Sequence, residues 1–203
     1  MTADHCLRPE FTEKLTRKLL KGESANLTGP QGRRRTLQDL RRSLPAPLIV
    51  LQANLHDYPE NAGALLKHLG GQLNHGNINS MGELLDHLEG SRKKHLLILH
   101  NFDELQQGEA SGYAGEFFDQ LGSINSRATI SLLCVSETAC GFPLQSSPLQ
   151  LPPLTSAQLL AELARRSPQM TQTELMPLAE SLAAEAAAYT ALESMVSVHC
   201  EKQ

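Results

Sequence analysis

Three short apolar runs, each separated from the next by a segment with helical periodicity, constrain the fold of this chain more than any other feature. The runs lie at 48–51, 96–99 and 129–135. Continuous apolar runs of this length are typical of strands that are buried on both faces, as they are in parallel sheets. Helical periodicity marks the segments 37–44, 61–73, 84–90 and 117–121. Strands that alternate with helices predict an α/β fold in which helices cover a parallel sheet.

The first part of the chain extends this pattern. Residues 11–20 carry apolar side chains at helical spacing, and the extended segment 24–28 follows them. A weak fifth strand is expected at 149–151. The sequence therefore predicts an amphipathic entry helix and a first strand ahead of the three apolar runs.

The last fifty residues differ in composition from the rest of the chain. After two consecutive prolines the sequence becomes rich in Leu, Ala and Glu, which predicts helices at 155–166 and 173–198. We therefore expect two domains, an α/β core over residues 1–153 and a small helical appendage over residues 154–203.

The charge balance excludes binding that is driven by bulk attraction. Of 203 residues, 18 are Lys or Arg and 22 are Asp or Glu, so the formal net charge is −4 at pH 7. Such a chain is not drawn to nucleic acid or to an anionic membrane as a whole, although a local basic patch still can bind. No apolar run approaches the roughly 18 residues of a membrane span, and the N-terminus lacks the pattern of a signal peptide. We expect a cytoplasmic protein with no membrane partner.

The cysteines and histidines indicate no metal centre. Cys6, Cys134, Cys140 and Cys200 are scattered without a CxxC pair, which argues against a disulfide framework and against a cysteine-rich zinc site. His100 has no second ligand at a recognisable spacing. The sequence therefore predicts reduced cysteines and no metal site.

The segment 29–36, Gly-Pro-Gln-Gly-Arg-Arg-Arg-Thr, lies between the first strand and the helix behind it. A phosphate-binding loop G-x-x-x-x-G-K-[ST] would stand at this place, and in that register Gly29 and Thr36 match. Arg34 occupies the position of the second glycine, and Arg35 occupies that of the lysine. The glycine lets backbone N–H groups surround the phosphates, and the lysine reaches them as a compact charge. Because a longer, planar guanidinium does not reproduce that ammonium group, half of the motif is missing.

The acidic half of the usual phosphate machinery is also altered. An acidic residue normally ends a buried strand, where it helps to hold magnesium. Here His100 follows the apolar run 96–99. Asp103 and Glu104 come soon after it and are the candidates for a replacement carboxylate. Ser136 ends the next strand and is placed to sense a terminal phosphate.

Five arginines belong to the helix expected behind the glycine loop. Arg33, Arg34 and Arg35 stand at its N-terminus, where positive charge opposes the helix dipole unless an anion is bound. That anion is a nucleotide phosphate or, with Arg41 and Arg42 further along, a nucleic-acid backbone.

These residues carry a resemblance to a known family. The succession LTGPQGRRRT, LLILHNFDEL, LLCVSET and LPPLTSAQLLAELARR resembles the P-loop ATPases of the AAA+/STAND group, most of all small bacterial ATP-binding proteins of signalling and conflict systems. The resemblance covers nearly the whole chain. It implies a three-layer P-loop NTPase-like fold with strand order 5-1-4-3-2, a helical lid and ATP with magnesium. It places Gly29, Gly32 and Thr36 on the phosphate loop, Arg35 on the lysine, His100 on the magnesium-binding aspartate and Ser136 near the first sensor.

Loss of both the lysine and the aspartate predicts a pseudo-enzyme. Our first hypothesis is a degenerate P-loop domain that binds ATP weakly or not at all and serves as a regulatory or scaffolding subunit of a protein partner or of a homo-oligomer.

Two alternatives stay open. The first is a working ATPase in which Arg35 contacts the phosphates and Asp103 or Glu104 replaces the missing acid at a shifted magnesium site. The second is a nucleic-acid-binding module that uses the arginines at 33–35 and at 41–42.

Overall fold

The computed structural model describes residues 5–75, 78–106, 112–113, 115–138, 148–184, 188–190 and 192. Five strands run through these residues: β1 (Ala25–Thr28), β2 (Ile49–Asn54), β3 (His95–His100), β4 (Ile130–Ser136) and β5 (Leu149–Gln150). The helices are α1 (Pro9–Leu20), α2 (Arg33–Ser43), α3 (Ala62–Gln72), α4 (Met81–Gly90), α5 (Gly115–Gly122), α6 (Ser156–Arg166) and α7 (Gln172–Ala183). Short 3-10 helices follow β2, β3 and α5, at Leu55–Asp57, Phe102–Gln106 and Ser123–Ser126.

The five strands form one sheet in the order β2-β3-β4-β1-β5, and every neighbouring pair is parallel. In the register of this sheet Thr28 lies opposite Ser136, and Asn54 lies opposite His100. The carboxyl ends of the strands therefore meet along one edge. The observed order confirms both the predicted fold class and the predicted succession 5-1-4-3-2, and β5 confirms the weak fifth strand.

Two compact units divide the chain. The sheet unit comprises Leu15–Gly29 and Leu44–Gln150, and the helical unit comprises Met1–Lys14, Pro30–Ser43 and Leu151–Gln203. The helical unit is thus assembled from three separate segments. The expected domain boundary after residue 153 stays a prediction.

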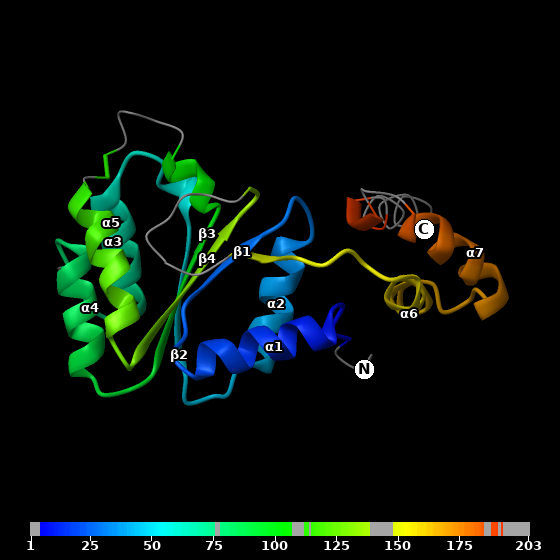
Figure 1. The fold of residues 1–203 in the computed structure, drawn as a ribbon, viewed down its shortest axis with the longest axis horizontal. Helices are drawn as coiled ribbons and strands as arrows, with labels where there is room; N and C mark the ends of the chain where they lie inside the picture. Colours follow the sequence, from blue (N-terminus) through cyan, green and yellow to red (C-terminus); the bar gives the residue numbers. More distant parts are fainter. Residues whose placement is uncertain are drawn as a thin grey trace. The chain divides into compact units, whose positions relative to one another are not determined.

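In the sheet unit α3, α4 and α5 lie together beside the sheet (Figure 1). Their leucines join the side chains of β3 and β4 in one apolar core, and all seven residues of β4 are buried. Local side chains fix where the helices begin. Asn61 accepts a hydrogen bond from the backbone N–H of Ala64 (2.8 Å), and Ser80 accepts one from that of Glu83 (3.1 Å). Such caps satisfy N–H groups that have no partner inside the helix.

In the helical unit α6 and α7 pack on each other around a second apolar core. Both helices begin with a capping box, formed by Thr155 with Gln158 and by Thr171 with Glu174. Of the helix expected at 173–198, α7 covers the part up to Ala183, and residues 188–190 and 192 are helical as well. The prediction for 185–187, for 191 and for 193–198, like Cys140 and Cys200, lies outside the described residues.

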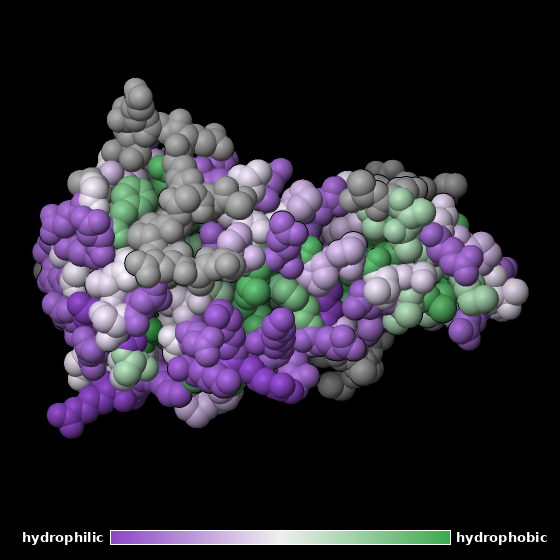
Figure 2. Space-filling view, viewed as in Figure 1, coloured by the Kyte–Doolittle hydropathy of each residue, from purple (hydrophilic) through white to green (hydrophobic). Residues whose placement is uncertain are grey.

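The surface is mixed in polarity. Hydrophilic side chains cover the position of α1 on the face shown in Figure 2, where Glu10, Lys14 and Arg17 are exposed. Among the described residues the exposed large apolar side chains are Met170 and Met176. None of the helices in the described part of the chain combines the length and the apolar character needed to span a membrane.

Shortening a core side chain of β3 tests this packing. Leu97 is fully buried in the core of the sheet unit, so Leu97→Ala should lower the free energy of unfolding by about 2–5 kcal/mol. Urea unfolding followed by circular dichroism measures the loss. The control Met176→Ala removes a side chain that is 49% exposed and should change stability by less than about 0.5 kcal/mol. Equal losses in the two variants would contradict the assigned core.

Candidate functional site

The glycine loop enters α2 through a left-handed residue. Gly32 has φ +76°, a conformation that side chains other than glycine rarely adopt. The hydroxyl of Thr36 and its backbone N–H both donate to the carbonyl oxygen of Gly32, each at 3.0 Å. Thr36 is buried. The Thr36 side chain, one of the predicted phosphate-loop residues, therefore secures the first turn of the helix.

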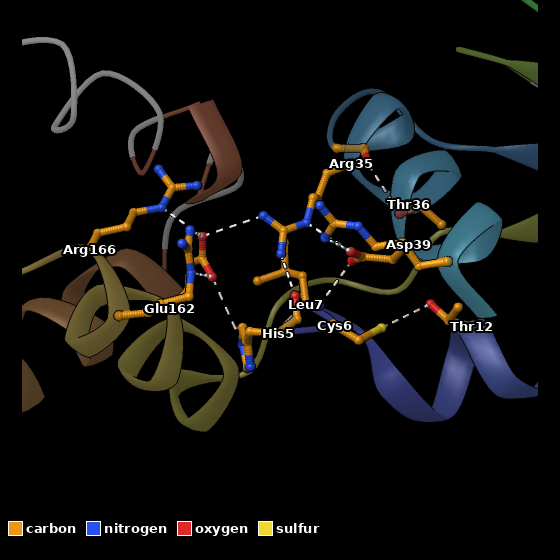
Figure 3. A network of polar contacts seen from close by, with 12 residues as sticks. His5, Cys6, Leu7, Thr12, Arg35, Thr36, Asp39, Glu162 and Arg166 are labelled. Carbon is orange, nitrogen blue, oxygen red and sulfur yellow. Dashed lines mark hydrogen bonds and ion pairs between the residues drawn. The ribbon is translucent and has the colours of Figure 1, made fainter. Parts of the chain in front are cut away.

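Arg35, which stands at the lysine position, is bound by oxygen atoms of the protein (Figure 3). Its Nε donates to Oδ1 of Asp39 at 3.0 Å, one helical turn further on. Its Nη1 lies 3.6 Å from Oε1 of Glu162 on α6, and its Nη2 donates to the carbonyl oxygen of His5. Since all three nitrogen atoms face an oxygen, this guanidinium is committed to the helical unit itself.

Asp39 is the first of two buried carboxylates in this network. Its Oδ2 accepts a hydrogen bond from the backbone N–H of Leu7 at 2.9 Å, and its Oδ1 also lies 3.8 Å from Nη1 of Arg42. Asp39 thus fastens the N-terminal segment to α2 while it neutralises Arg35. This pairing involves two arginines of the predicted basic patch.

Glu162 is the second carboxylate, and its side chain is fully buried. It accepts two hydrogen bonds from Arg165 (3.0 and 2.7 Å) and one from Arg166 (2.6 Å), and His5 lies 3.9 Å away. Burial alone raises the pKa of this carboxyl. The hydrogen bonds from Arg165 and Arg166 outweigh burial and lower the pKa of Glu162 to about 2.

A further guanidinium faces the glycine loop. Arg8 is only 5% exposed, and its Nε donates to the carbonyl oxygen of Pro152 at 2.9 Å. Its Nη1 is buried without a hydrogen-bond partner in the described structure. A Cβ placed on Gly32 would lie 3.1 Å from this nitrogen and 3.4 Å from the ring of Tyr189. Burial lowers the pKa of Arg8, against the influence of Tyr189 and Asp39.

Sequence reasoning missed Arg8, Asp39 and Glu162. The spacing i, i+4 between Arg35 and Asp39, and the run Glu162, Arg165, Arg166, were readable as helical ion pairs. No local signal indicated that α6 would reach Arg35, or that Arg8 would face Gly32.

In the sheet unit the predicted acidic candidates have other partners. Glu104 pairs with His56 at 3.2 Å on the surface. Asp103 accepts a long hydrogen bond, 3.4 Å, from the backbone N–H of Glu137. His100 ends β3 and is partly exposed. Each of the two carboxylates therefore already has a partner in the sheet unit, and neither occupies the place of His100 at the end of β3.

Ser136 and Gly29 are brought together at the end of β4. The backbone N–H of Gly29 donates to the carbonyl oxygen of Ser136 at 3.3 Å. The hydroxyl of Ser136 is buried without a hydrogen-bond partner in the described structure. Buried polar groups are normally satisfied, so an unpaired hydroxyl here is compatible with a ligand.

The predicted site residues thus fall into two sets. Gly32, Arg35 and Thr36 lie in the helical unit, whereas Gly29, Asp103, Glu104 and Ser136 lie in the sheet unit. Within the described ranges no three His, Cys, Asp or Glu side chains gather to hold a metal ion.

Part of the predicted basic patch takes part in the ion-pair network of Asp39 and Glu162. Arg34, Arg41 and Arg42 are exposed, and Arg33 is partly exposed. Arg35 is largely buried and paired. The side chains of Arg34, Arg41 and Arg42 on α2 are therefore within reach of an anionic surface, and Arg42 also lies near Asp39.

The low pKa of Glu162 makes its contribution to stability depend on pH. The folded value of about 2 lies below the ordinary value of 4.5, so the charged form favours folding above about pH 4.5, and this contribution is lost as the pH falls toward 2. We expect Glu162→Gln to lower the free energy of unfolding at pH 7, and the gap to the unmodified protein to shrink between pH 4.5 and pH 2. Urea unfolding at several pH values measures this gap. Glu180→Gln, an exposed change on α7, should leave it near zero throughout, and a gap for Glu162→Gln that does not change with pH would refute the assignment.

Comparisons with known proteins give a likeness of fold. No protein-family model and no curated protein matches this sequence. Among solved structures, Cdc6p from Pyrobaculum aerophilum has a TM-score of 0.64 at 15% identity, with 88% of this chain and 56% of that chain covered. The Walker-type ATPase of Pyrococcus abyssi gives 0.63 at 14% identity, with coverage of 88% and 64%. The ORC2 protein of Aeropyrum pernix, in ADPNP–ADP complexes, gives 0.61 at 16% identity, with coverage of 88% and 57%.

This chain therefore spans 56–64% of the length of those three proteins. At such identities the likeness concerns the fold alone. Together with the parallel strand order 5-1-4-3-2, it shows that the chain has a P-loop NTPase-like α/β fold.

Proposed function

We propose that this chain is a degenerate P-loop domain with impaired or absent ATP hydrolysis, and that it acts as a regulatory or scaffolding subunit of the STAND type in a bacterial signalling or conflict system. The observation that carries the proposal is the state of Arg35. The guanidinium at the lysine position is held by Asp39, Glu162 and the carbonyl of His5, so it is not free to reach a terminal phosphate.

The neighbouring loop residues support the same conclusion. Arg34 occupies the position where glycine would let the backbone approach a phosphate, and its side chain is exposed. The Thr36 hydroxyl, which matches the motif, donates to the carbonyl oxygen of Gly32. The exchange at position 34 removes a part of the machinery that positions a triphosphate.

The ends of the strands add a separate argument. His100 supplies an imidazole where a carboxylate would favour magnesium, which prefers oxygen ligands. Glu104 is paired with His56, and Asp103 accepts from the backbone of Glu137. The working-ATPase alternative needs one of these two carboxylates to leave its present partner.

Weak nucleotide binding is compatible with the unpaired groups. Nη1 of Arg8 and the hydroxyl of Ser136 are buried hydrogen-bonding groups without partners in the described structure. Within the helical unit a nucleotide phosphate would accept from Nη1 of Arg8, and its phosphoryl groups, with magnesium, would supply the reactive chemistry. The ORC2 protein of Aeropyrum pernix was solved with ADPNP and ADP, which supports nucleotide as the ligand class proposed here.

A partner protein is the second part of the proposal. Among the described residues the sheet ends in two edge strands, β2 and β5. The backbone of Gln52 on β2 is bonded to Gln72 of α3, so we propose the edge at β5 for pairing with another chain. A Drosophila ORC structure, similar in fold at a TM-score of 0.51 and 15% identity, is bound to Cdc6 and AT-rich DNA. By analogy we place this chain in an assembly, either with another protein or with copies of itself.

Phosphate release tests the enzymatic part of this proposal. We expect the purified chain with 1 mM ATP and magnesium to release phosphate no faster than Thr36→Ala, because neither protein positions the terminal phosphate. A coupled phosphate assay compares the two under identical purification, so that a contaminating ATPase contributes equally. A rate that exceeds background and disappears in Thr36→Ala would establish the working-ATPase alternative instead.

Nucleic-acid binding is the second candidate function, favoured by the exposed side chains of Arg34, Arg41 and Arg42 on one helix. If it is correct, a gel shift at 50 mM salt should show a complex, and the double variant Arg34→Gln with Arg41→Gln should bind more weakly. The affinity of the unmodified chain should fall about tenfold or more between 50 mM and 200 mM salt. Lys67→Gln with Lys93→Gln, two exposed changes in the sheet unit, serves as the control of equal charge change. Absence of a retarded band at 50 mM salt would eliminate this candidate.

A further inference from the structure

One buried carboxylate joins several separate parts of the helical unit. Glu162 on α6 lies 3.6 Å from Arg35 on α2 and 3.9 Å from His5 in the N-terminal segment. Arg166, which donates to Glu162, also donates to the carbonyl oxygen of Leu192 near the end of the described chain. Figure 3 shows this network, with Glu162 and Arg35 facing each other from their two helices.

The chemistry of Arg35 makes this contact more than a structural tie. A guanidinium binds carboxylates and phosphates through the same planar set of N–H donors. Glu162 therefore offers Arg35 the kind of charged oxygen that a phosphate would offer. Asp39 takes Nε, the carbonyl of His5 takes Nη2, and Glu162 faces Nη1.

We propose that Glu162 is an internal anion that occupies Arg35 in place of a phosphate, and that this autoinhibitory contact keeps α6 closed on α2 without any nucleotide. The inference rests on the proposed function, because it describes the regulation of the same degenerate site. It assigns the lid helix the task of competing with a phosphate-bearing ligand for Arg35.

The contact is built so that it can open. Arg165 and Arg166 hydrogen-bond Glu162 from its own helix at 2.6–3.0 Å, whereas Arg35 lies further away, at 3.6 Å. If Arg35 moves away, Glu162 keeps two charged partners and Arg35 keeps Asp39. Breaking a buried ion pair is most costly when it leaves a buried charge without a partner. Opening of this contact leaves no such charge.

A double-mutant cycle on the full chain tests the proposal. Hydrogen exchange of the amides of α2, α6 and α7 reports closure of the helical unit, and fluorescence of a mant-labelled ATP reports access to Arg35. We expect Glu162→Gln to accelerate exchange about tenfold or more and to strengthen mant-ATP binding about fivefold or more, as is typical of coupled sites. Arg35→Gln should accelerate exchange equally without any gain in binding, and the double variant should exchange no faster than either single one.

Additive exchange effects would overturn the proposal, because they would mean that Glu162 acts through Arg165 and Arg166 alone. Faster exchange without tighter mant-ATP binding would overturn it as well. Glu180→Gln, which neutralises an exposed carboxylate on α7, should match the unmodified protein in both measurements.

Folding of the variants is checked by circular dichroism. If Glu162→Gln does not fold, Arg35→Lys is tested instead, since one ammonium group cannot contact Asp39, Glu162 and His5 together. Unchanged hydrogen exchange in Arg35→Lys would then refute the proposed contact between Glu162 and Arg35. The proposed function fails separately, if the unmodified chain hydrolyses ATP in the phosphate assay.

Discussion

Burying charge is costly unless each charged group finds a partner, and this constraint shapes the helical unit. Arg8, Asp39 and Glu162 are nearly or fully withdrawn from solvent, and Arg35 is largely so. The two carboxylates lie where the arginines of three chain segments converge. Asp39 joins α2 to the backbone of Leu7, and Glu162 joins α6 to Arg35. The placement of these segments within the unit therefore follows from neutralisation as much as from the apolar core around α6 and α7.

The same constraint explains why Arg35 and a lysine are not interchangeable at this position. A guanidinium has donors in a plane wide enough to reach Asp39, Glu162 and a carbonyl at once, whereas an ammonium group is a compact point of charge. The exchange of lysine for arginine thus fits its surroundings. The arginine contacts oxygen atoms of the protein, whereas the lysine of a phosphate loop contacts the ligand.

The sequence predicted the sheet well because the signal for it is local. Runs of consecutive Leu, Ile and Val are costly to leave in water, so 48–51, 96–99 and 129–135 became strands whose ends lie within three residues of the expected bounds. The strand order came from the resemblance, and the observed sheet confirms it. Of the helix expected at 173–198, the described residues 173–183, 188–190 and 192 are helical.

The site was less predictable because its decisive contacts are not local. Arg35 was correctly identified as the residue at the lysine position, but Glu162 lies on a helix of another segment, and only the folded chain brings the two together. Arg8 precedes α1, where the sequence indicates nothing beyond a charged residue next to a proline. Glu104 was a candidate carboxylate because it follows β3, yet an exposed histidine of the 3-10 helix after β2 became its partner.

These couplings also determine what would be needed to restore phosphate chemistry. A lysine at position 35 would still lie one helical turn from Asp39, a buried anion that attracts an ammonium group as well. Position 100 would still carry an imidazole, and Arg34 would still replace the glycine that lets the backbone approach a phosphate. Reversal of any one change leaves the others in place. Under the proposed function, the impaired phosphate chemistry therefore depends on several residues of the helical unit and on the end of β3. Under the proposed function, the ion pairs of Arg35 stabilise the helical unit and at the same time withhold the guanidinium from a phosphate.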